Sequence, residues 1–184
     1  MRLRYNSFYE GREIGLLLSP YVLMFSRRSW YVIGRSSLHR DIRTFHLGRI
    51  LESTLTDDSF KPPPRFSAAK HLGLAWHMIR EPDKKERVVV HFRPLVAGNV
   101  AEVTWHPTQQ IVHRDDGSIE FSATVEGLRE ISWWILGYGD QAEVLEPREL
   151  RDMVAERVRG MAATYGITEP KTSPPASRTR KRPR

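Results

Sequence analysis

The chain has 184 residues, 40% of them hydrophobic and 28% charged, which fits a globular protein of one medium domain or two small ones. It has no cysteine, which excludes disulfides, thiolate zinc sites and a cysteine nucleophile. Most of the net charge of +7 comes from residues 170–184, which carry six basic side chains and no acidic one.

The remaining charge is polarised along the chain. Residues 1–57 carry nine arginines, no lysine and five acidic side chains, a net charge of +4, whereas residues 84–166 carry ten basic and thirteen acidic side chains, a net charge of −3. A guanidinium group binds phosphate through two parallel hydrogen bonds and stacks on bases, which an ammonium group cannot do. We therefore expect an anion-binding surface in the first third of the chain and not in its last half.

Short strand-like runs make up the first 57 residues. Leu3 and Tyr5 alternate with arginines, and the tight Arg27-Arg28 connection predicts a hairpin. No helical period is present, so the spacing predicts a small barrel or a strongly bent sheet for residues 1–60. The further runs are 14–18, 21–25, 30–34, 42–50 and 51–56.

A proline-rich segment, Lys61-Pro62-Pro63-Pro64, then breaks any strand, and we place a domain boundary there. Apolar residues recur at helical spacing from Ser67 to Ile79, so residues 61–83 are predicted to be a linker with one helix that stops at Glu81-Pro82.

The last part alternates between strand and helix patterns. Asp115-Asp116-Gly117-Ser118 predicts a hairpin turn, and a final helix is expected from Glu146-Pro147 to Gly166. The order βαββαβα predicts a ferredoxin-like domain over residues 84–168, and the fold class is therefore α+β. Residues 169–184 are expected to be a disordered basic tail. The other expected elements are 87–92, 96–103, 110–114, 119–125, 128–136 and 143–145.

Several ordered motifs resemble one known family. Trp30-Tyr31-Val32 and Arg43-Thr44-Phe45-His46-Leu47-Gly48-Arg49-Ile50 resemble the WYL domain of bacterial transcriptional regulators, and Trp105-His106-Pro107 and Trp134-Ile135-Leu136 resemble the extension that commonly follows it. The resemblance covers roughly residues 1–165. It implies an SH3- or Sm-like barrel that senses a nucleic acid or nucleotide-like anion, joined to a dimerising C-terminal domain.

The sequence departs from the family pattern at three points. Val32 replaces leucine, His46 stands where the family often has arginine, and Gly48 where it often has aspartate. Within the family a winged helix that binds promoter DNA usually precedes the barrel, and residues 1–60 contain no such element. The chain is then either a fragment of a longer regulator or a stand-alone sensor.

Arg43 and Arg49 are the sharpest candidates for ligand binding. In an unbroken strand they share a face but lie roughly 20 Å apart, too far to hold one phosphate. Either the strand breaks at Gly48, or the two arginines contact successive phosphates of an oligonucleotide. The full set of predicted ligand residues is Arg43, Arg49, Arg40, Arg35, Tyr31, Tyr21 and His46.

The aromatic pair Trp30-Tyr31 points to opposite faces of its strand. We expect Trp30 in the core, while Tyr31 is free to stack on a base or to hydrogen-bond a phosphate. Arg27 and Arg28 are expected to be solvated at the hairpin tip. Trp133 and Trp134 are expected to divide between the core and an interface.

Other kinds of chemistry find little support. His39 and His46 have no acidic or histidine partner at ligand spacing, and His71 and His77 do not share one helix face, so no metal and no cofactor is expected. No nucleophile with a base and an orienting group, and no catalytic carboxylate pair, stands out, so we expect no enzyme. No apolar run is long enough to span a bilayer, so we expect a cytoplasmic protein without membrane contact.

The main hypothesis is a ligand-sensing and dimerisation module of a transcriptional regulator, with an anionic effector and a homodimeric state. Promoter DNA is a partner only if a winged helix is attached. One alternative is a protein-interaction module acting through the acidic second half, and another is an RNA-binding accessory protein.

Overall fold

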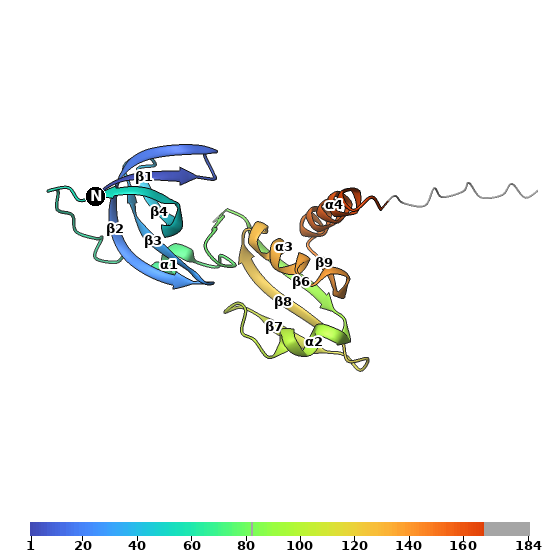
Figure 1. Ribbon diagram of the computed structural model, residues 1–184. Helices are drawn as coiled ribbons and strands as arrows, with labels where there is room; N and C mark the ends of the chain where they lie inside the picture. Colours follow the sequence, from blue (N-terminus) through green and yellow to red (C-terminus); the bar gives the residue numbers. More distant parts are fainter. Residues whose placement is uncertain (82, 168–184) are drawn as a thin grey trace, which may run out of the picture. The chain divides into compact units, whose positions relative to one another are not determined.

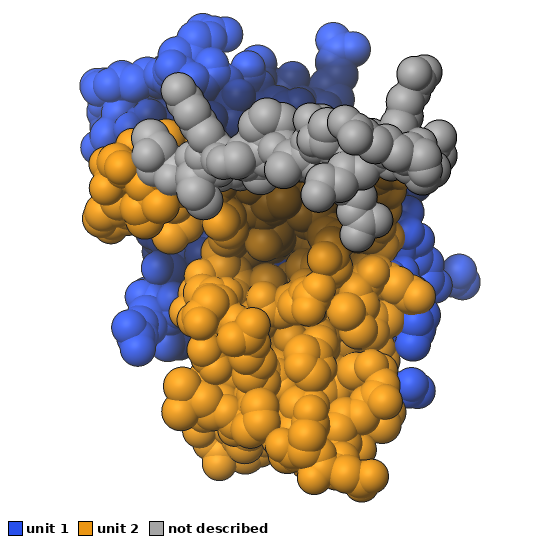
Figure 2. Space-filling view, turned by 90° about the vertical axis from the view of Figure 1, so that its right-hand side faces the viewer, with its two compact units in different colours: residues 1–87, 104–110, 123–131 blue, residues 88–103, 111–122, 132–184 orange. Residues whose placement is uncertain are grey.

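The computed structural model describes residues 1–81 and 83–167 (Figure 1). They form two antiparallel sheets and four α-helices, which confirms the α+β class. The chain divides into two compact units (Figure 2). Unit 1 comprises Met1–Arg87, Thr104–Gln110 and Ala123–Ile131, and unit 2 comprises Val88–Val103, Ile111–Ser122 and the residues from Ser132 onward. The predicted tail, residues 169–184, lies outside the described residues.

The first sheet is a run of antiparallel strands in the order β4-β3-β2-β1-β5. Strand β2 is long and curved, pairing with β1 through its first part and with β3 from Leu18 onward (Figure 1). The runs 14–18 and 21–25, predicted as separate, are therefore parts of one strand, with a register shift between Pro20 and Val22. The strands are β1 (Arg2–Ser7), β2 (Arg12–Ser26), β3 (Ser29–Ser36), β4 (Asp41–His46) and β5 (Ile50–Thr54).

Alternating burial explains how these strands enclose a core. In β1 the arginines are exposed while Leu3 and Tyr5 are buried, and Tyr5 meets Phe45 edge-on with ring centroids 5.1 Å apart. Burying such a side chain contributes about 1.5–3 kcal/mol. The buried cluster consists of Leu3, Tyr5, Ile14, Leu16, Leu18, Val32 and Phe45.

Two connections set the positions of the predicted ligand residues. The hairpin at Arg27-Arg28 is confirmed, because β2 and β3 pair up to Ser26 and Ser29. The predicted strand over 42–50 is wrong, since β4 ends at His46 and Leu47–Arg49 forms a 3₁₀ turn. The strand therefore breaks before Arg49, and the use of both arginines by one ligand stays a prediction.

The predicted linker helix is also shorter than expected. Helix α1 covers Ala68–Leu72 and ends at Gly73, whose φ of 56° lies in the left-handed region. Beyond it, the backbone N–H groups of His77, Met78 and Ile79 donate to the Glu130 carboxylate at 2.8, 3.0 and 3.1 Å. In a longer helix these N–H groups would donate to backbone carbonyls of the preceding turn. Here they donate instead to a carboxylate more than fifty residues away in the sequence.

The second sheet has the order β7-β8-β6-β9. Its strands are β6 (Lys85–Phe92), β7 (Gln110–His113), β8 (Ile119–Glu126) and β9 (Ala142–Glu146), and the accompanying helices are α2 (Pro94–Ala101), α3 (Arg129–Leu136) and α4 (Arg148–Thr164). The predicted turn is confirmed, because Asp116 accepts hydrogen bonds from the backbone and the hydroxyl of Ser118.

Buried aromatic rings form much of the core of unit 2. Trp134 packs against Phe92 and Phe121 with ring centroids 5.3 and 5.1 Å apart, whereas the neighbouring Trp133 is 51% exposed. The expected core position of one of the two, Trp134, is confirmed, and an interface at Trp133 stays a prediction. No helix in the described part of the chain has the length and apolar character needed to cross a bilayer.

Candidate functional site

The register of β3 against β4 decides which predicted ligand residues can meet. Tyr31 lies opposite His46, and Gly34 lies opposite Arg43. Side chains alternate between the two faces of a strand, and Phe45 faces the core. His46 and Tyr31 therefore lie on the outer face of the sheet, as does Arg35, while Arg43 shares the face of Phe45. The seven predicted residues do not gather on one face.

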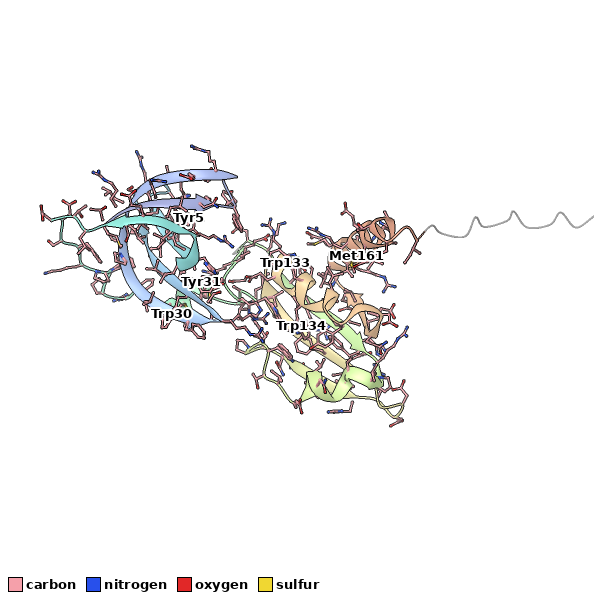
Figure 3. The ribbon with its side chains drawn as sticks, in the orientation of Figure 1. Tyr5, Trp30, Tyr31, Trp133, Trp134 and Met161 are labelled. Carbon is pink, nitrogen blue, oxygen red and sulfur yellow. The ribbon has the colours of Figure 1, made fainter. Side chains whose placement is uncertain are left out.

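On the outer face, Tyr31 and His46 form a pair. Their rings meet edge-on with centroids 5.1 Å apart, and both side chains are half-buried. Tyr31 is labelled in Figure 3. The backbone N–H of His46 donates to the Tyr5 hydroxyl at 3.2 Å. Its ring Nδ1 is buried and has no hydrogen-bond partner among the described residues.

The two main departures from the family pattern are neighbours in space. A Cβ added to Gly48 would lie 3.0 Å from Cε1 and 3.2 Å from Nδ1 of His46. Any side chain at position 48 would therefore press on the imidazole, and only glycine leaves the ring where it is. The positions of His46 and Gly48 therefore depend on each other, because the imidazole ring occupies the space that a side chain at position 48 would need.

Arg43 sits in a mixed polar neighbourhood at the edge of the sheet. It lies 3.6 Å from the Asp41 carboxylate, and both side chains are largely exposed, so this ion pair is weak. The neighbouring Thr44 hydroxyl lies 3.3 Å from Nε2 of His71, on α1. Burial lowers the pKa of His71; Asp41 opposes this, and Arg80 and Arg43 add to it.

The other predicted arginines are held differently. The Arg49 guanidinium lies 3.8 Å from the centroid of the Phe8 ring, a cation–π contact. Arg40 has a φ of 53° in the connection between β3 and β4. Arg35 and Arg40 are exposed and form no ion pair within the described residues.

Tyr21 is engaged by the proline-rich segment. Its ring packs against Phe66 and Phe60, with centroid separations of 5.0 and 6.0 Å. It lies at the register shift in β2 and holds the segment that follows the first sheet, so its ring is already covered on these sides.

Two adjoining hollows in unit 1 bring in residues that the sequence analysis missed. The first hollow has a volume of about 490 Å³ and is lined by Arg2 and Glu52. The second has a volume of about 250 Å³ and is lined by Arg35 and Phe60. Leu17 and Ser37 line both hollows. Alternation along residues 2–5 already placed Arg2 on the outer face, but the pairing of β1 with β2 and β5 was not readable from the sequence.

The expectation that Trp30 is a core residue is wrong. Trp30 is 48% exposed and packs against Phe25, which is 59% exposed, with ring centroids 5.3 Å apart. Trp30 shares its face with the buried Val32, so the predicted face was correct. The hairpin extends past the end of the core, which leaves the ring without cover.

Three histidines of unit 1 have lowered pKa values. Burial, with contributions from Arg27 and His106, lowers the pKa of His77 to about 4. Burial also lowers the pKa of His106, whose ring stacks on Trp76 with an interplanar angle of 8°. Across residues 1–81 and 83–167 no group of three or more metal-ligating side chains occurs.

Ser36, His39 and Glu10 come nearest to a catalytic set. Nδ1 of His39 lies 2.9 Å from the Ser36 hydroxyl, and Nε2 lies 3.6 Å from the Glu10 carboxylate. Ser36 is fully buried and its oxygen also accepts the backbone N–H of His39 at 3.3 Å. The arrangement fixes a turn and exposes no nucleophile to a substrate.

Comparison with known proteins gives two domain matches and distant relatives. Over 149 residues the chain is 23% identical to "Uncharacterized HTH-type transcriptional regulator YobV" of Bacillus subtilis (strain 168), which covers 79% of this chain and 45% of that protein. Among solved structures, a CRISPR Cas-related protein has a similar fold, with a TM-score of 0.57 and 11% identity over 90% of this chain and 47% of that one. Proteasome accessory factor B/C of Arthrobacter aurescens is 22% identical with a TM-score of 0.38, over 97% of this chain and 27% of that one.

This chain therefore spans less than half the length of each of these relatives. The domain matches follow the chain order expected from its motifs. The WYL domain matches residues 1–55, and the WCX domain matches residues 84–162. The chain therefore carries a WYL domain followed by a WCX domain, as its motifs predict.

Proposed function

We propose that this chain is the ligand-sensing and dimerisation module of a bacterial transcriptional regulator, and that its barrel binds an anionic, nucleic-acid-derived effector. One observation carries the proposal. Of Arg35, Arg40, Arg43 and Arg49, only Arg43 lies within ion-pair distance of a carboxylate in the described part of the chain, and that carboxylate is exposed. These guanidinium groups remain available to an anion.

The position of β4 explains how one ligand could use residues on two faces. β4 is the first strand in the order of its sheet, and within residues 1–81 and 83–167 it has β3 as its only partner strand. A ligand that passes over this edge contacts Arg43 on one face and the Tyr31–His46 pair on the other. An extended ligand such as an oligonucleotide is long enough to do so, and a single phosphate is not.

Both sheets support the finer fold prediction. In the first, β5 returns to pair with β1 beside a curved β2, as expected of an SH3- or Sm-like barrel. In the second, the strands read 2-3-1-4 in order of appearance, as expected of a ferredoxin-like sheet.

Dimerisation is assigned to unit 2. On α4 the apolar positions follow one stripe, of which Leu150 is buried while Val158, Met161 and Tyr165 are 51%, 50% and 78% exposed. α4 packs against β9, and its C-terminal half lies beyond that contact (Figure 1). Such a stripe favours association. Met161→Glu should lower the mass measured by light scattering from dimer to monomer, whereas the exposed Glu156→Ala should not. A dimer that survives Met161→Glu would reject this surface.

The same exposed stripe also favours the second candidate function, a protein-interaction module that needs no effector. We further propose that the module has no enzymatic activity, since Ser36 is inaccessible. Promoter binding is proposed only for a longer chain that carries a winged helix.

Binding of a fluorescently labelled twelve-residue deoxythymidylate strand tests the proposed site. We expect Arg43→Ala with Arg49→Ala to weaken binding at least tenfold, because each guanidinium contributes one phosphate contact. Arg12→Ala is the matched control, since Arg12 is an exposed arginine of β2 outside the proposed site. Equal affinity of the double variant and the wild type would contradict the site assignment.

A further inference from the structure

The β2–β3 hairpin has a chemistry of its own. Residues 14–40 contain four arginines and not one carboxylate. Two of these arginines, Arg27 and Arg28, form the tip of the hairpin and are exposed. A segment that carries several arginines and no carboxylate of its own suits a polyanion.

The tip is built at a conformational cost. Arg27 has a φ of 44° and Arg28 a φ of 66°, as in a type I′ turn. Such turns favour Asn-Gly, because residues with a Cβ lose about 1–2 kcal/mol in the left-handed region. The positive φ at Arg28 is a cost to the turn itself, and a role outside the turn explains an arginine at this position.

Two aromatic rings lie immediately behind the tip. Phe25 and Trp30 are cross-strand neighbours in contact, and both remain about half exposed. Leu23 lies two residues back on the same face and is 55% exposed. Together these three side chains make an apolar platform that begins two residues from the Arg27-Arg28 turn.

We propose that this hairpin is a stacking site for single-stranded nucleic acid, separate from the barrel residues Arg43 and Arg49. A base lies on the Trp30–Phe25 platform, and Arg28 contacts the adjacent phosphate. The inference rests on the proposed function in one respect, that the module takes a nucleic-acid ligand. It differs in placing the contact at the tip of the β2–β3 hairpin, on residues that are not part of the proposed effector site.

The combination of aromatic rings and arginines in this hairpin favours single-stranded nucleic acid over other anionic partners. A single strand offers a flat base next to a phosphate at every residue, and base–aromatic stacking tolerates any sequence. An acidic protein surface would satisfy the arginines but would supply no flat group for the platform. Inorganic polyphosphate, likewise, satisfies only the charge.

Arg28→Gly separates a role in folding from a role in binding. Glycine relieves the strain at a φ of 66°, so the melting temperature should rise by about 2–4 °C. The same change should lower affinity for labelled twelve-residue deoxythymidylate and reduce the salt slope by about 0.7. A higher melting temperature with unchanged affinity would show that the tip is only a turn.

A series at Trp30 tests the platform. Trp30→Leu keeps an apolar side chain without a flat face and should weaken binding roughly tenfold, while Trp30→Phe should retain most of the affinity. Oligouridylate should bind as deoxythymidylate does, and polyphosphate should bind Trp30→Leu and the wild type alike. If Trp30→Leu bound the oligonucleotide as the wild type does, stacking would be rejected.

These variants also distinguish the two proposals from each other. If the hairpin variants lose binding and Arg43→Ala with Arg49→Ala does not, the hairpin site stands and the barrel site fails. If only the barrel variant loses binding, the hairpin inference is overturned. Arg12→Ala should leave both readouts unchanged.

Discussion

Tyr31 and His46 meet edge-on across β3 and β4, with ring centroids 5.1 Å apart. The geometry depends on Gly48, because a Cβ there would come within 3.0 Å of the imidazole. Two departures from the family pattern, His46 at the end of β4 and Gly48 in the turn that follows, are therefore one structural adjustment. This adjustment fixes the position of the His46 ring at the β4 edge of the sheet.

Gly48→Ala should disturb that edge. The new methyl group displaces the imidazole by a few tenths of an ångström and weakens its contact with Tyr31. We expect a several-fold loss of oligonucleotide affinity, measured by anisotropy. Gly15→Ala is the matched control, since a Cβ at Gly15 meets nothing within 4 Å. Equal effects of the two substitutions would show that the His46 position does not matter for binding.

Gly34→Ala should destabilise the barrel. Gly34 is buried, and an added Cβ would lie 2.3 Å from the Ser19 carbonyl oxygen and 2.9 Å from the Pro20 Cα, both backbone atoms. Such crowding costs about 1–3 kcal/mol, because β2 and β3 would have to separate. The free energy of unfolding in urea measures the loss. A value equal to that of Gly15→Ala would mean that the strands adjust without cost.

Glu130→Ala should loosen the segment that follows α1. Its carboxylate accepts the backbone N–H groups of His77, Met78 and Ile79, and removing it leaves three donors without an acceptor. We expect a loss of about 2–4 kcal/mol in the free energy of unfolding. Hydrogen exchange of these amides should accelerate in the variant. Unchanged exchange would show that water replaces the carboxylate without penalty, and the exposed Glu156→Ala serves as the control.

The fold should lose stability in mild acid. His77 has a folded pKa of about 4 against 6.5 in the unfolded chain, chiefly because of burial. Between these values the unfolded state binds a proton that the folded state does not, so stability is complete above pH 6.5 and falls as the pH drops towards 4. The lowered pKa values of His71 and His106 act in the same direction. In His77→Gln the decline should be shallower, and an identical profile would exclude His77 as a source.

The parts of the fold that the sequence could predict depend on residues close together in the chain. Three predictions used signals that act within a few residues, and each is confirmed. They are the hairpin at Arg27-Arg28, the turn at Asp116-Gly117 and the helix that follows Pro147. The order of strands and helices in residues 84–166 follows from the same kind of signal.

Non-local partners account for what could not be predicted. Leu72, Ala75 and Trp76 have helical spacing, yet the helix ends at Gly73 and Glu130 takes the next backbone donors. Alternation placed Trp30 on the correct face, but it cannot tell where along a strand the core ends. The scatter of the seven candidate residues over two faces depends on the β3–β4 register, which no local signal contains.

The salt dependence of oligonucleotide binding by the whole chain tests the central claim most directly. Anisotropy of labelled twelve-residue deoxythymidylate would be recorded between 50 and 300 mM salt, with log affinity plotted against log salt. Binding through several guanidinium–phosphate contacts predicts a straight line with a negative slope of about 0.7 per contact, reduced in Arg43→Ala with Arg49→Ala. No binding at 50 mM salt, or a slope near zero, would contradict the claim that this arginine-bearing barrel senses a nucleic-acid-derived anion.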